Sequence, residues 1–526
     1  MTSILKYLNR ALLVLLLAAF AACSDNEGGN ESNGNGDDGN TETPADGDTY
    51  GYIKDTNGNP VEGVVVSDGY SCTATDAEGR YALTRNADAG FVFYSLPSAY
   101  KVSVYKTYKL PRFFARLQAG TARYDFTLEA LAAPEKRFDL ICIGDPQINE
   151  ASHAVRFKEE AGREIREYAA SAGVPCYGIT LGDHVNNKWT LFTNMVVALQ
   201  PEQTGVPVFA TIGNHDHEFP TADEKAARAK YESYFGPVDY SFNRGDVHVV
   251  SMDNVIHSCK ASADYEGGFT AAQYAWLKQD LSFVPKDKMV ILCVHIPFRG
   301  GWGTNSAHAD ADKYYDEVLD LLSQYEYAAI MSAHTHSNIN YIHRKNGKEI
   351  FEHVTGTTCG AWWRSTVCTE GTPIGFGLYR IDGNRMEEWA YRSVRHDEQF
   401  QIRLYRASDT FVGGAKYRFK QTGADQIVAN IWNWDPSWTV NVYENDVLSG
   451  QMTRNSDIDA WTVAYHIGLL NNTDSYRKSS DHMFHYTLKN PAAAVRVEAI
   501  DRFGNKYEQT VFTDPAEHPG DFHADF

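Results

Sequence analysis

The pattern of hydrophobic and polar positions changes along the chain, and in the first region hydrophobic and polar residues alternate. From residue 50 to about residue 132, short Val, Tyr and Thr runs are separated by Asn-Gly, Asp-Gly and Glu-Gly turns, as in GYIKDTNGNPVEGVVVSDG. Alternating runs between such turns predict antiparallel strands. We therefore expect a small β-sandwich over 50–132, and no catalytic set of residues stands out in it.

The pattern changes near residue 133, where continuous apolar runs replace the alternation. Such runs are typical of strands that are buried on both faces. Five of them are RFDLICIGD, VPCYGITLGD, VPVFATIGNHD, KMVILCVHIP and YAAIMSAHTH. Helical patterns lie between them, which predicts an α/β layered domain over 133–395.

Two of the intervening helices have clear sequence signals. The first has apolar residues at helical spacing and Gly173 placed to end it. Its apolar residues are Phe157, Ala161, Ile165 and Tyr168. The second begins with a capping box of Thr270 and Gln273. It should present Tyr274, Leu277 and Leu281 to the core.

From residue 396 to residue 526 the chain is again rich in Tyr, Val and Thr with Asn, Asp and Gly turns, as in TVNVYEND. This pattern predicts a second all-β domain, with no helix of useful length. The expected fold class is therefore multidomain: a central α/β sandwich of sheets flanked by helices, with all-β domains on both sides.

The first 49 residues have the composition of a targeting segment and a tether. Lys6 and Arg10 precede an apolar run, and small residues lead to Cys23. This resembles a bacterial lipoprotein signal peptide over 1–22, with Cys23 as the lipidated residue. The alternative is an ordinary secretory signal with an unrelated cysteine. Residues 23–49 lack aliphatic core formers, so we expect an acidic, flexible tether.

Charge and cysteine content narrow the possible partners. A net charge of −20 argues against binding to nucleic acid. It also offers no basic attraction to anionic lipid, so the lipid anchor is the expected membrane contact. The expected location is the outer membrane, at the cell surface or in the periplasm. Seven cysteines follow Cys23, and an odd number cannot all pair within one chain. Cys142 and Cys293 should be buried, whereas Cys359 and Cys368 could form a disulfide or remain free thiols.

Each of the five apolar runs ends in side chains that can bind a metal ion. A single residue of this kind is usually an ordinary polar residue at a strand end. Five strands that all end in such residues are not explained in that way. Ligands bind at the carboxyl ends of strands in α/β sheets, so these side chains should converge. They are Asp145 and Gln147; Asp183; Asn214, His215 and Asp216; His295; and His334 and His336. Nitrogen and oxygen ligands without thiolate favour manganese, iron, zinc or cobalt, and a carboxylate can bridge two ions.

The blocks GD-P-Q, GD, GNHD, H and AH-T-H, in this order, resemble those of the calcineurin-like metallophosphoesterases over roughly 137–395. The resemblance implies two divalent ions bridged by Asp183. The first ion would also be held by Asp145, Gln147 and His336. The second would also be held by Asn214, His295 and His334.

The same resemblance implies roles for the residues next to Asn214. His215 would donate a proton to the leaving oxygen, Asp216 would orient His215, and His217 would lie at the surface. Two positions depart from the usual pattern: Gln147 stands where most members have His, and Ala333 where Gly is usual. The flanking domains resemble those of a three-domain bacterial branch of this family. The first of them also resembles carboxypeptidase-regulatory-like sandwiches.

The implied function is metal-dependent hydrolysis of a phosphomonoester or phosphodiester. A hydroxide shared by the two ions would attack, and His215 would protonate the leaving group. The alternative is a surface lipoprotein that binds glycan or protein and whose metal site is structural. Intact His215 and Asp216 argue against that alternative, because a structural site needs neither. A redox pair of irons is disfavoured because no tyrosine occupies the expected ligand position near Asp183.

Substrate contacts are less constrained, and the expected substrate is a phosphorylated small molecule or glycan. Trp362 and Trp363 suit stacking on a sugar or a base, and Arg364 suits a phosphate oxygen. Packing between domains is the alternative for these three residues. Arg299 follows His295 closely and could contact substrate, or it could be an ordinary surface arginine.

Overall fold

The computed structural model describes residues 47–261, 264–299, 314–409, 418–471 and 477–513. The predicted signal peptide, Cys23 and nearly all of the tether therefore lie outside the described residues. Within the described ranges, no helix combines the length and the apolar character needed to cross a bilayer.

The N-terminal region forms two small sheets, as its alternating pattern predicts. One has the order β4-β1-β7 and the other β3-β2-β5-β6. Their bounds are β1 Thr49–Asp55, β2 Val65–Ser67, β3 Cys72–Ala74, β4 Arg80–Leu83, β5 Phe91–Tyr94, β6 Phe114–Arg116 and β7 Phe126–Leu128. One pairing departs from the expected antiparallel arrangement, because β1 and β7 run parallel.

The central region contains two larger sheets that hold all five predicted apolar runs. The first has the order β10-β9-β8-β19-β20 and the second β11-β12-β15-β16-β18-β17. The first sheet comprises β8 Arg137–Ile143, β9 Cys176–Leu181, β10 Val208–Thr211, β19 Gly375–Asp382 and β20 Arg385–Ser393. The second comprises β11 Tyr240–Arg244, β12 Val247–Ser251, β15 Met289–Cys293, β16 Tyr327–Ser332, β17 Ile339–Lys345 and β18 Lys348–Val354. A separate hairpin joins β13 Val255–His257 and β14 Tyr265–Gly267.

Strand β8 shows why its sequence is a continuous apolar run. Leu140 and Cys142 belong to the core that also contains residues of the second sheet. Ile141 and Ile143 point the other way, into the core shared with the helices that cover the first sheet. Successive side chains of a strand point to opposite faces, so the part of β8 that lies between two layers, Leu140 to Ile143, is apolar at every position.

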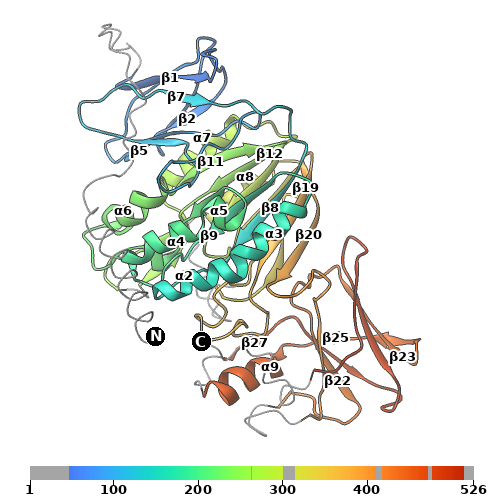
Figure 1. Cartoon of the computed structure of the whole chain (residues 1–526). Coiled ribbons are helices and arrows are strands. Elements are labelled where there is room, and N and C mark those ends of the chain that lie inside the picture. The colour runs from blue at the N-terminus through green and yellow to red at the C-terminus, as the bar shows by residue number, and fades with distance from the viewer. Residues whose placement is uncertain (1–46, 262–263, 300–313, 410–417, 472–476, 514–526) are drawn as a thin grey trace, which may run out of the picture. The chain divides into compact units, whose positions relative to one another are not determined.

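Helices cover the outer faces of these sheets, and Figure 1 shows α2, α3 and α4 across the sheet that holds β8 and β9. The first predicted helix is one continuous run: α2 Ala151–Phe157, the π-helical turn η1 Lys158–Gly162 and α3 Arg163–Ser171. Gly173, at a φ of 73°, follows its end as predicted. The others are α4 Phe192–Ala198, α5 Pro201–Thr204, α6 Glu224–Phe235, α7 Ala271–Ser282 and α8 Tyr315–Leu322. Thr270 and Gln273 form the expected capping box before α7.

The C-terminal region has two four-stranded sheets, β21-β22-β28-β25 and β24-β23-β29-β30, and a short pair, β26 with β27. Their bounds are β21 Arg403–Arg406, β22 Gln426–Asn430, β23 Thr439–Glu444, β24 Val447–Gln451, β25 Thr453–Arg454, β26 Asp457–Ile458, β27 Ser479–Ser480, β28 Met483–Thr487, β29 Val495–Ile500 and β30 Lys506–Gln509. The expectation of no useful helix is wrong. Helix α9 Ala460–Thr462 continues into the π-helical segment η6 Val463–Leu469. Asp459 caps it, and Trp461, Val463 and Tyr465 pack into a local core that β-rich composition concealed.

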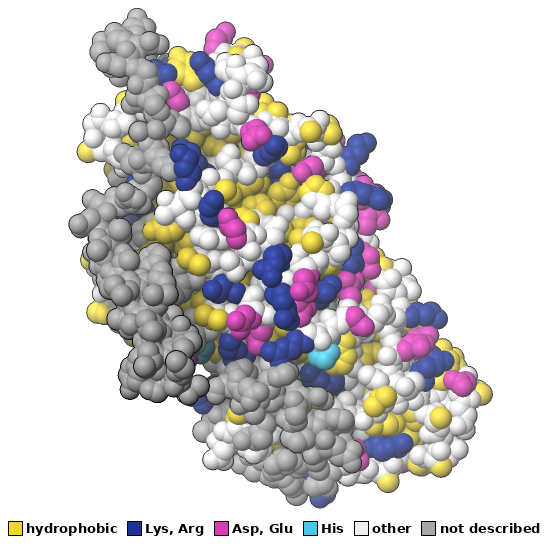
Figure 2. Space-filling model, in the orientation of Figure 1, with side chains coloured by type: hydrophobic (Ala, Val, Ile, Leu, Met, Phe, Trp, Pro, Cys, Tyr) yellow, Lys and Arg dark blue, Asp and Glu magenta, His cyan; other side chains and the backbone are white. Residues whose placement is uncertain are grey.

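Acidic and basic side chains are interspersed on the face of the molecule drawn in Figure 2.

Cys142 and Cys293 are buried, as predicted. Cys359 and Cys368 are both free thiols and both buried. The structure therefore favours the second of the two alternatives for that pair.

Candidate metal centre

The metal-binding candidates come from strand ends of both central sheets. Asp145 follows β8, Asp183 follows β9 and Asn214 follows β10, all in the first sheet. His295 follows β15, and His334 and His336 follow β16, in the second sheet. The edges of the two sheets therefore deliver their polar residues to one place, as the parallel order of these strands predicts.

Two glycines allow the strand ends to approach this closely. A Cβ on Gly182 would lie 2.4 Å from Nδ1 of His295, and a Cβ on Gly213 would lie 2.3 Å from the backbone nitrogen of Asp183. Both distances are shorter than atoms can tolerate. Glycine is therefore required before Asp183 and before Asn214 because the backbones converge there.

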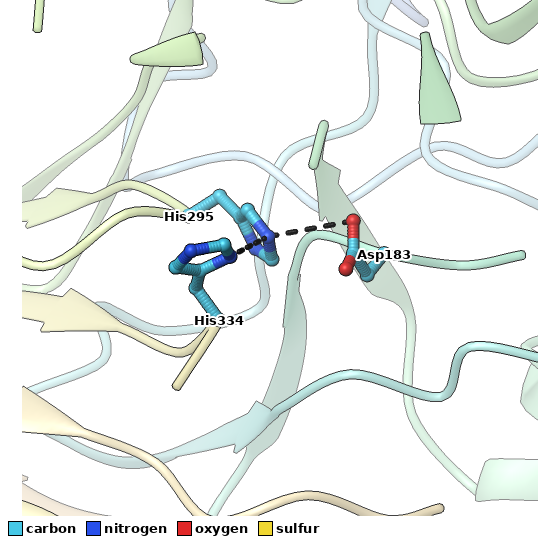
Figure 3. A group of neighbouring side chains, drawn as sticks. All are labelled: Asp183, His295 and His334. Carbon is cyan, nitrogen blue, oxygen red and sulfur yellow. Dashed lines mark hydrogen bonds and ion pairs between the residues drawn. The ribbon is translucent and has the colours of Figure 1, made fainter. Parts of the chain in front are cut away.

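The cluster divides into two groups of potential ligands that share one carboxylate. Asp145, Asp183 and His336 form one group, and Asp183, His295 and His334 form the other, with the ligand atoms of each group within 4.8 Å of one another. Figure 3 shows the second group, in which the rings of His295 and His334 meet edge to face and His295 lies between His334 and Asp183. A shared carboxylate is the arrangement that a two-ion site requires.

In the second group, the imidazole of His295 is held in a defined tautomer. Its Nδ1 lies 2.7 Å from the carbonyl oxygen of Leu181. Because a carbonyl can only accept, Nδ1 carries a proton and donates it, which leaves Nε2 as the nitrogen available to a metal ion. Nε2 faces Oδ1 of Asn214 at 2.9 Å and Nδ1 of His334 at 3.2 Å. Three atoms that can bind a metal ion, Nε2 of His295, Oδ1 of Asn214 and Nδ1 of His334, thus converge beside Asp183.

In the first group, two buried oxygen atoms have no hydrogen-bond partner among the described residues: Oδ1 of Asp145 and Oε1 of Gln147. Nε2 of His336 lies 3.6 Å from the former. The amide nitrogen of Gln147 donates to Oδ2 of Asp183 at 3.0 Å, so its amide lies at the shared carboxylate. Buried oxygens without partners are costly, and a cation would satisfy both.

The backbone is strained at the same residues. The φ angles of Asp145, Gln147, Asp183, His334 and His336 are 39°, 37°, 52°, 65° and 55°. Side chains other than glycine rarely adopt this left-handed region, and each such residue costs about 1–3 kcal/mol. Five strained polar residues at the ends of only three strands indicate that the surrounding fold holds these side chains for a function.

Burial and neighbouring charges set the protonation of the cluster. Burial raises the pKa of Asp145 well above its usual value. Burial also opposes charge on Asp183, but the neighbouring histidines outweigh it and hold that pKa well below its usual value. Burial lowers the pKa of His334 strongly and that of His336 to about 3, which favours the neutral, metal-binding imidazole. Burial disfavours charged His295 too, but Asp183 outweighs it and raises the pKa to about 9.

The partner of His215 differs from the sequence-based prediction. The carboxylate of Asp216 makes no hydrogen bond to the ring of His215. It instead accepts from the backbone nitrogen of His184 at 2.8 Å and pairs with Nδ1 of that residue at 2.9 Å. The ring of His215 pairs through Nδ1 with Oδ1 of Asn187 at 2.8 Å. The 3-10 turn η3 Asn214–Asp216 points successive side chains in different directions, so adjacent residues do not face each other.

His217 is buried, and the prediction that it lies at the surface is wrong. Its Nδ1 donates to the carbonyl oxygen of Gly213 at 2.9 Å, and its Nε2 pairs with Asp253 at 3.1 Å. This ring therefore closes the turn that carries Asn214 and His215. A lone polar residue after a metal-binding motif gave no sequence signal of that role.

The substrate-contact candidates separate into different environments. Trp362 lies against the ring of His336, with centroids 4.8 Å apart, so it belongs to the edge of the cluster. Trp363 is buried, donates to the carbonyl oxygen of Pro146 at 2.8 Å and stacks on His153, so these contacts lie within the central domain rather than between domains. Arg299 is exposed and lies over the ring of Tyr341 at 5.5 Å. Arg364 is exposed as well.

Three residues near the cluster carried no recognisable sequence signal. Asn187 contacts His215, as described above. The indole nitrogen of Trp189 donates to the carbonyl oxygen of His215 at 3.2 Å. The hydroxyl of Tyr265 lies 3.4 Å from Nε2 of His334, the nitrogen that faces away from His295. All three come from loops or hairpin ends, whose approach to a site depends on tertiary structure.

Known proteins resemble this chain in sequence and, more distantly, in structure. Purple acid phosphatases 23 and 18 of Arabidopsis thaliana are 26% identical over 181 residues and 25% identical over 182 residues. These alignments cover 31% and 32% of this chain but only 36% and 38% of the relatives. A purple acid phosphatase from yellow lupin, Lupinus luteus, aligns with a TM-score of 0.35 at 14% identity over 50% of this chain and 53% of its own. A 5'-nucleotidase precursor of Thermus thermophilus aligns with a TM-score of 0.30 at 10% identity over 49% and 54%.

Family comparisons cover nearly all of the described chain. Residues 126–338 match the calcineurin-like phosphoesterase domain. Residues 48–131 match the N-terminal domain of calcineurin-like phosphoesterases, and residues 352–507 match the C-terminal domain. Three matches in the correct order, with the converging strand ends inside the central one, lead to one conclusion. The chain belongs to the calcineurin-like phosphoesterase family.

Proposed function

We propose that this protein hydrolyses phosphoesters with the help of two divalent metal ions. The observation that carries the proposal is the position of Asp183, which belongs to both groups of potential ligands. His215 lies directly beside it, since the backbone nitrogen of His215 donates to Oδ1 of Asp183 at 2.8 Å. A structural metal site needs neither a shared carboxylate nor an adjacent imidazole.

The two groups of potential ligands have the side chains needed to hold two metal ions. The first would be held by Asp145, Gln147, Asp183 and His336, and the second by Asp183, Asn214, His295 and His334. When bound, such ions supply positive charge for the phosphoryl oxygens and lower the pKa of water. Nitrogen and oxygen donors without thiolate suit manganese, iron, zinc or cobalt.

His215 is the residue that would move a proton. Its Nδ1 faces an amide oxygen of Asn187, which can only accept, so Nδ1 carries a proton in every state of the ring. Nε2 is therefore the nitrogen that gains and releases a proton. Asn187 fixes the orientation of the ring, the task that the family resemblance assigned to Asp216. Asp216 instead braces the loop after Asp183 through the backbone of His184.

The test is turnover by purified protein that has been stripped with a chelator. Added manganese, iron, zinc or cobalt should restore hydrolysis of a nitrophenyl phosphomonoester, of the bis-ester, or of both. The ratio of the two rates assigns the ester class. Full metal binding without hydrolysis of either ester would favour the glycan- or protein-binding alternative. The expected natural substrate is a phosphorylated small molecule or glycan.

We also propose that the protein is exported and anchored in the outer membrane through lipid on Cys23. The support is sequence pattern alone: basic residues, an apolar run, small residues and then a cysteine. Replacement of Cys23 by Ser should release soluble protein or leave the precursor unprocessed, because the acyl chains provide the membrane affinity. Unchanged membrane fractionation of Cys23→Ser would contradict this proposal.

A further inference from the structure

One short segment surrounds His215 on two sides. Asn187 faces its ring nitrogen at 2.8 Å, and Trp189, two residues later, holds its carbonyl oxygen at 3.2 Å. Trp189 begins the 3-10 turn η2 Trp189–Leu191. The indole of Trp189 is thereby fixed next to the residue that would protonate the leaving group.

Trp189 is paired with a second aromatic residue. The ring of Phe219 stands edge-on to it, with centroids 5.3 Å apart and an interplanar angle of 88°. Phe219 is itself stacked on His257, with centroids 6.0 Å apart and an angle of 19°. Both Trp189 and Phe219 are only partly buried, whereas His257 is buried. The pair therefore packs against a buried ring on one side and stays partly accessible to solvent.

The position of this pair matches one part of a phosphoester. The anionic phosphoryl group belongs at the ligand cluster, and the oxygen that leaves belongs at His215. The rest of the leaving group must then extend past His215, and the partly exposed aromatic residues next to His215 are Trp189, which holds its carbonyl oxygen, and Phe219, which packs on Trp189. Aromatic faces in this position favour a ring with an apolar face over a flexible polar chain.

We propose that Trp189 and Phe219 form a subsite for the leaving group, and that the natural leaving group is a ring-bearing alcohol. This inference rests on the proposed phosphoesterase function. A nucleobase and a sugar ring share the required chemistry, which is a flat or faceted ring with an apolar face. The nucleoside and sugar sources are separated by the choice of esters below.

The kinetic test compares three phosphomonoesters of primary alcohols: a nucleoside 5'-phosphate, ribose 5-phosphate and glycerol 3-phosphate. It uses wild type, Trp189→Phe, Trp189→Leu and Phe219→Leu, with melting temperature and metal content measured for each. Trp189→Phe keeps a ring but loses the hydrogen bond to His215. Trp189→Leu loses both, so the difference between these two variants isolates the ring.

Wild type should prefer a ring-bearing ester to glycerol 3-phosphate. Relative to Trp189→Phe, Trp189→Leu should lose about tenfold or more in kcat/KM on that ester and little on glycerol 3-phosphate. Phe219→Leu should show a smaller loss of the same kind. Preference for the nucleotide alone assigns a base, and equal preference for ribose 5-phosphate assigns a sugar. Equal losses on all three esters would reduce Trp189 to a brace for His215 and overturn the subsite.

A binding measurement separates this inference from the proposed function. Calorimetry on the metal-loaded protein would use non-hydrolysable phosphonate analogues of the nucleotide, ribose 5-phosphate and glycerol 3-phosphate. A ring analogue should bind about tenfold more weakly to Trp189→Leu than to Trp189→Phe, whereas the glycerol analogue should not distinguish them. If neither these monoesters nor the nitrophenyl bis-ester is hydrolysed but this difference is present, the phosphoesterase proposal fails and Trp189 belongs to a ring-binding site without a leaving group. If esters are hydrolysed and the difference is absent, the subsite fails and the phosphoesterase proposal stands.

Discussion

The two halves of the ligand cluster share Asp183 but are built differently. The half around His295 and His334 has two imidazoles, and a backbone carbonyl fixes the tautomer of His295. The half around Asp145 and His336 has one imidazole and the amide of Gln147, whose oxygen has no hydrogen-bond partner among the described residues. Imidazole is a stronger donor than an amide oxygen toward borderline metals. The comparison therefore predicts one firmly held ion and one that is lost more readily.

Replacement of Asp183 by Asn should have the largest effect, because it removes the one residue that both halves share. A neutral amide cannot balance two cations, so both ions should be lost and activity with them. Elemental analysis of the purified variant measures this directly. Two ions per chain at wild-type affinity in Asp183→Asn would contradict the assignment.

His215→Ala should leave both halves of the cluster loaded while kcat falls by about 10²–10⁴, the usual size of a proton-transfer contribution. The loss should shrink for esters with acidic leaving groups, which depart without a proton. Asn187→Ala is the matched variant, because it removes the partner of the ring but leaves the ring itself. Asn187→Ala should show a smaller loss of the same kind. If His215→Ala lost equally on nitrophenyl and alkyl esters, His215 would not have this role.

Gln147→His would make the two halves more alike. An imidazole at this position should raise the affinity of the weaker ion by about tenfold and reduce the dependence of activity on added manganese. Gln147→Ala should have the opposite effect on that dependence. Titrations of activity against manganese for wild type and both variants decide the matter, and superimposable curves would place Gln147 outside the metal site.

Tyr265→Phe should give the smallest effect and should act on the other half. The hydroxyl lies 3.4 Å from Nε2 of His334, so its removal frees the outer side of one imidazole in the second group. We expect a several-fold loss of affinity for one ion, at the low end of what such outer contacts contribute. A metal-competition titration should show this loss of affinity for the ion near His295 and His334, whose affinity Gln147→His leaves unchanged. A loss confined to the ion near Gln147 would reverse the proposed order of the two halves.

The sequence by itself determined the layered central fold and the set of candidate ligands. In strand β8 the stretch from Leu140 to Ile143 is apolar at every position because both of its faces are covered, and that pattern is visible without a structure. The polar residues at five strand ends were equally visible, because a buried run that stops at Asp, Asn or His breaks its own pattern. Cys142 and Cys293 were predicted to be buried for the same reason.

Only the tertiary structure decided which side chains meet. The family resemblance implied Asp216 as the partner of His215, but the turn Asn214–Asp216 sends these side chains apart and Asn187 takes that place. Trp189 and Tyr265 reach the cluster from a 3-10 turn and a hairpin that have no periodic signature. The short C-terminal helix was hidden because packing, rather than local propensity, stabilises it. Contacts between distant segments depend on how loops pack on a finished core, and local sequence patterns do not contain that information.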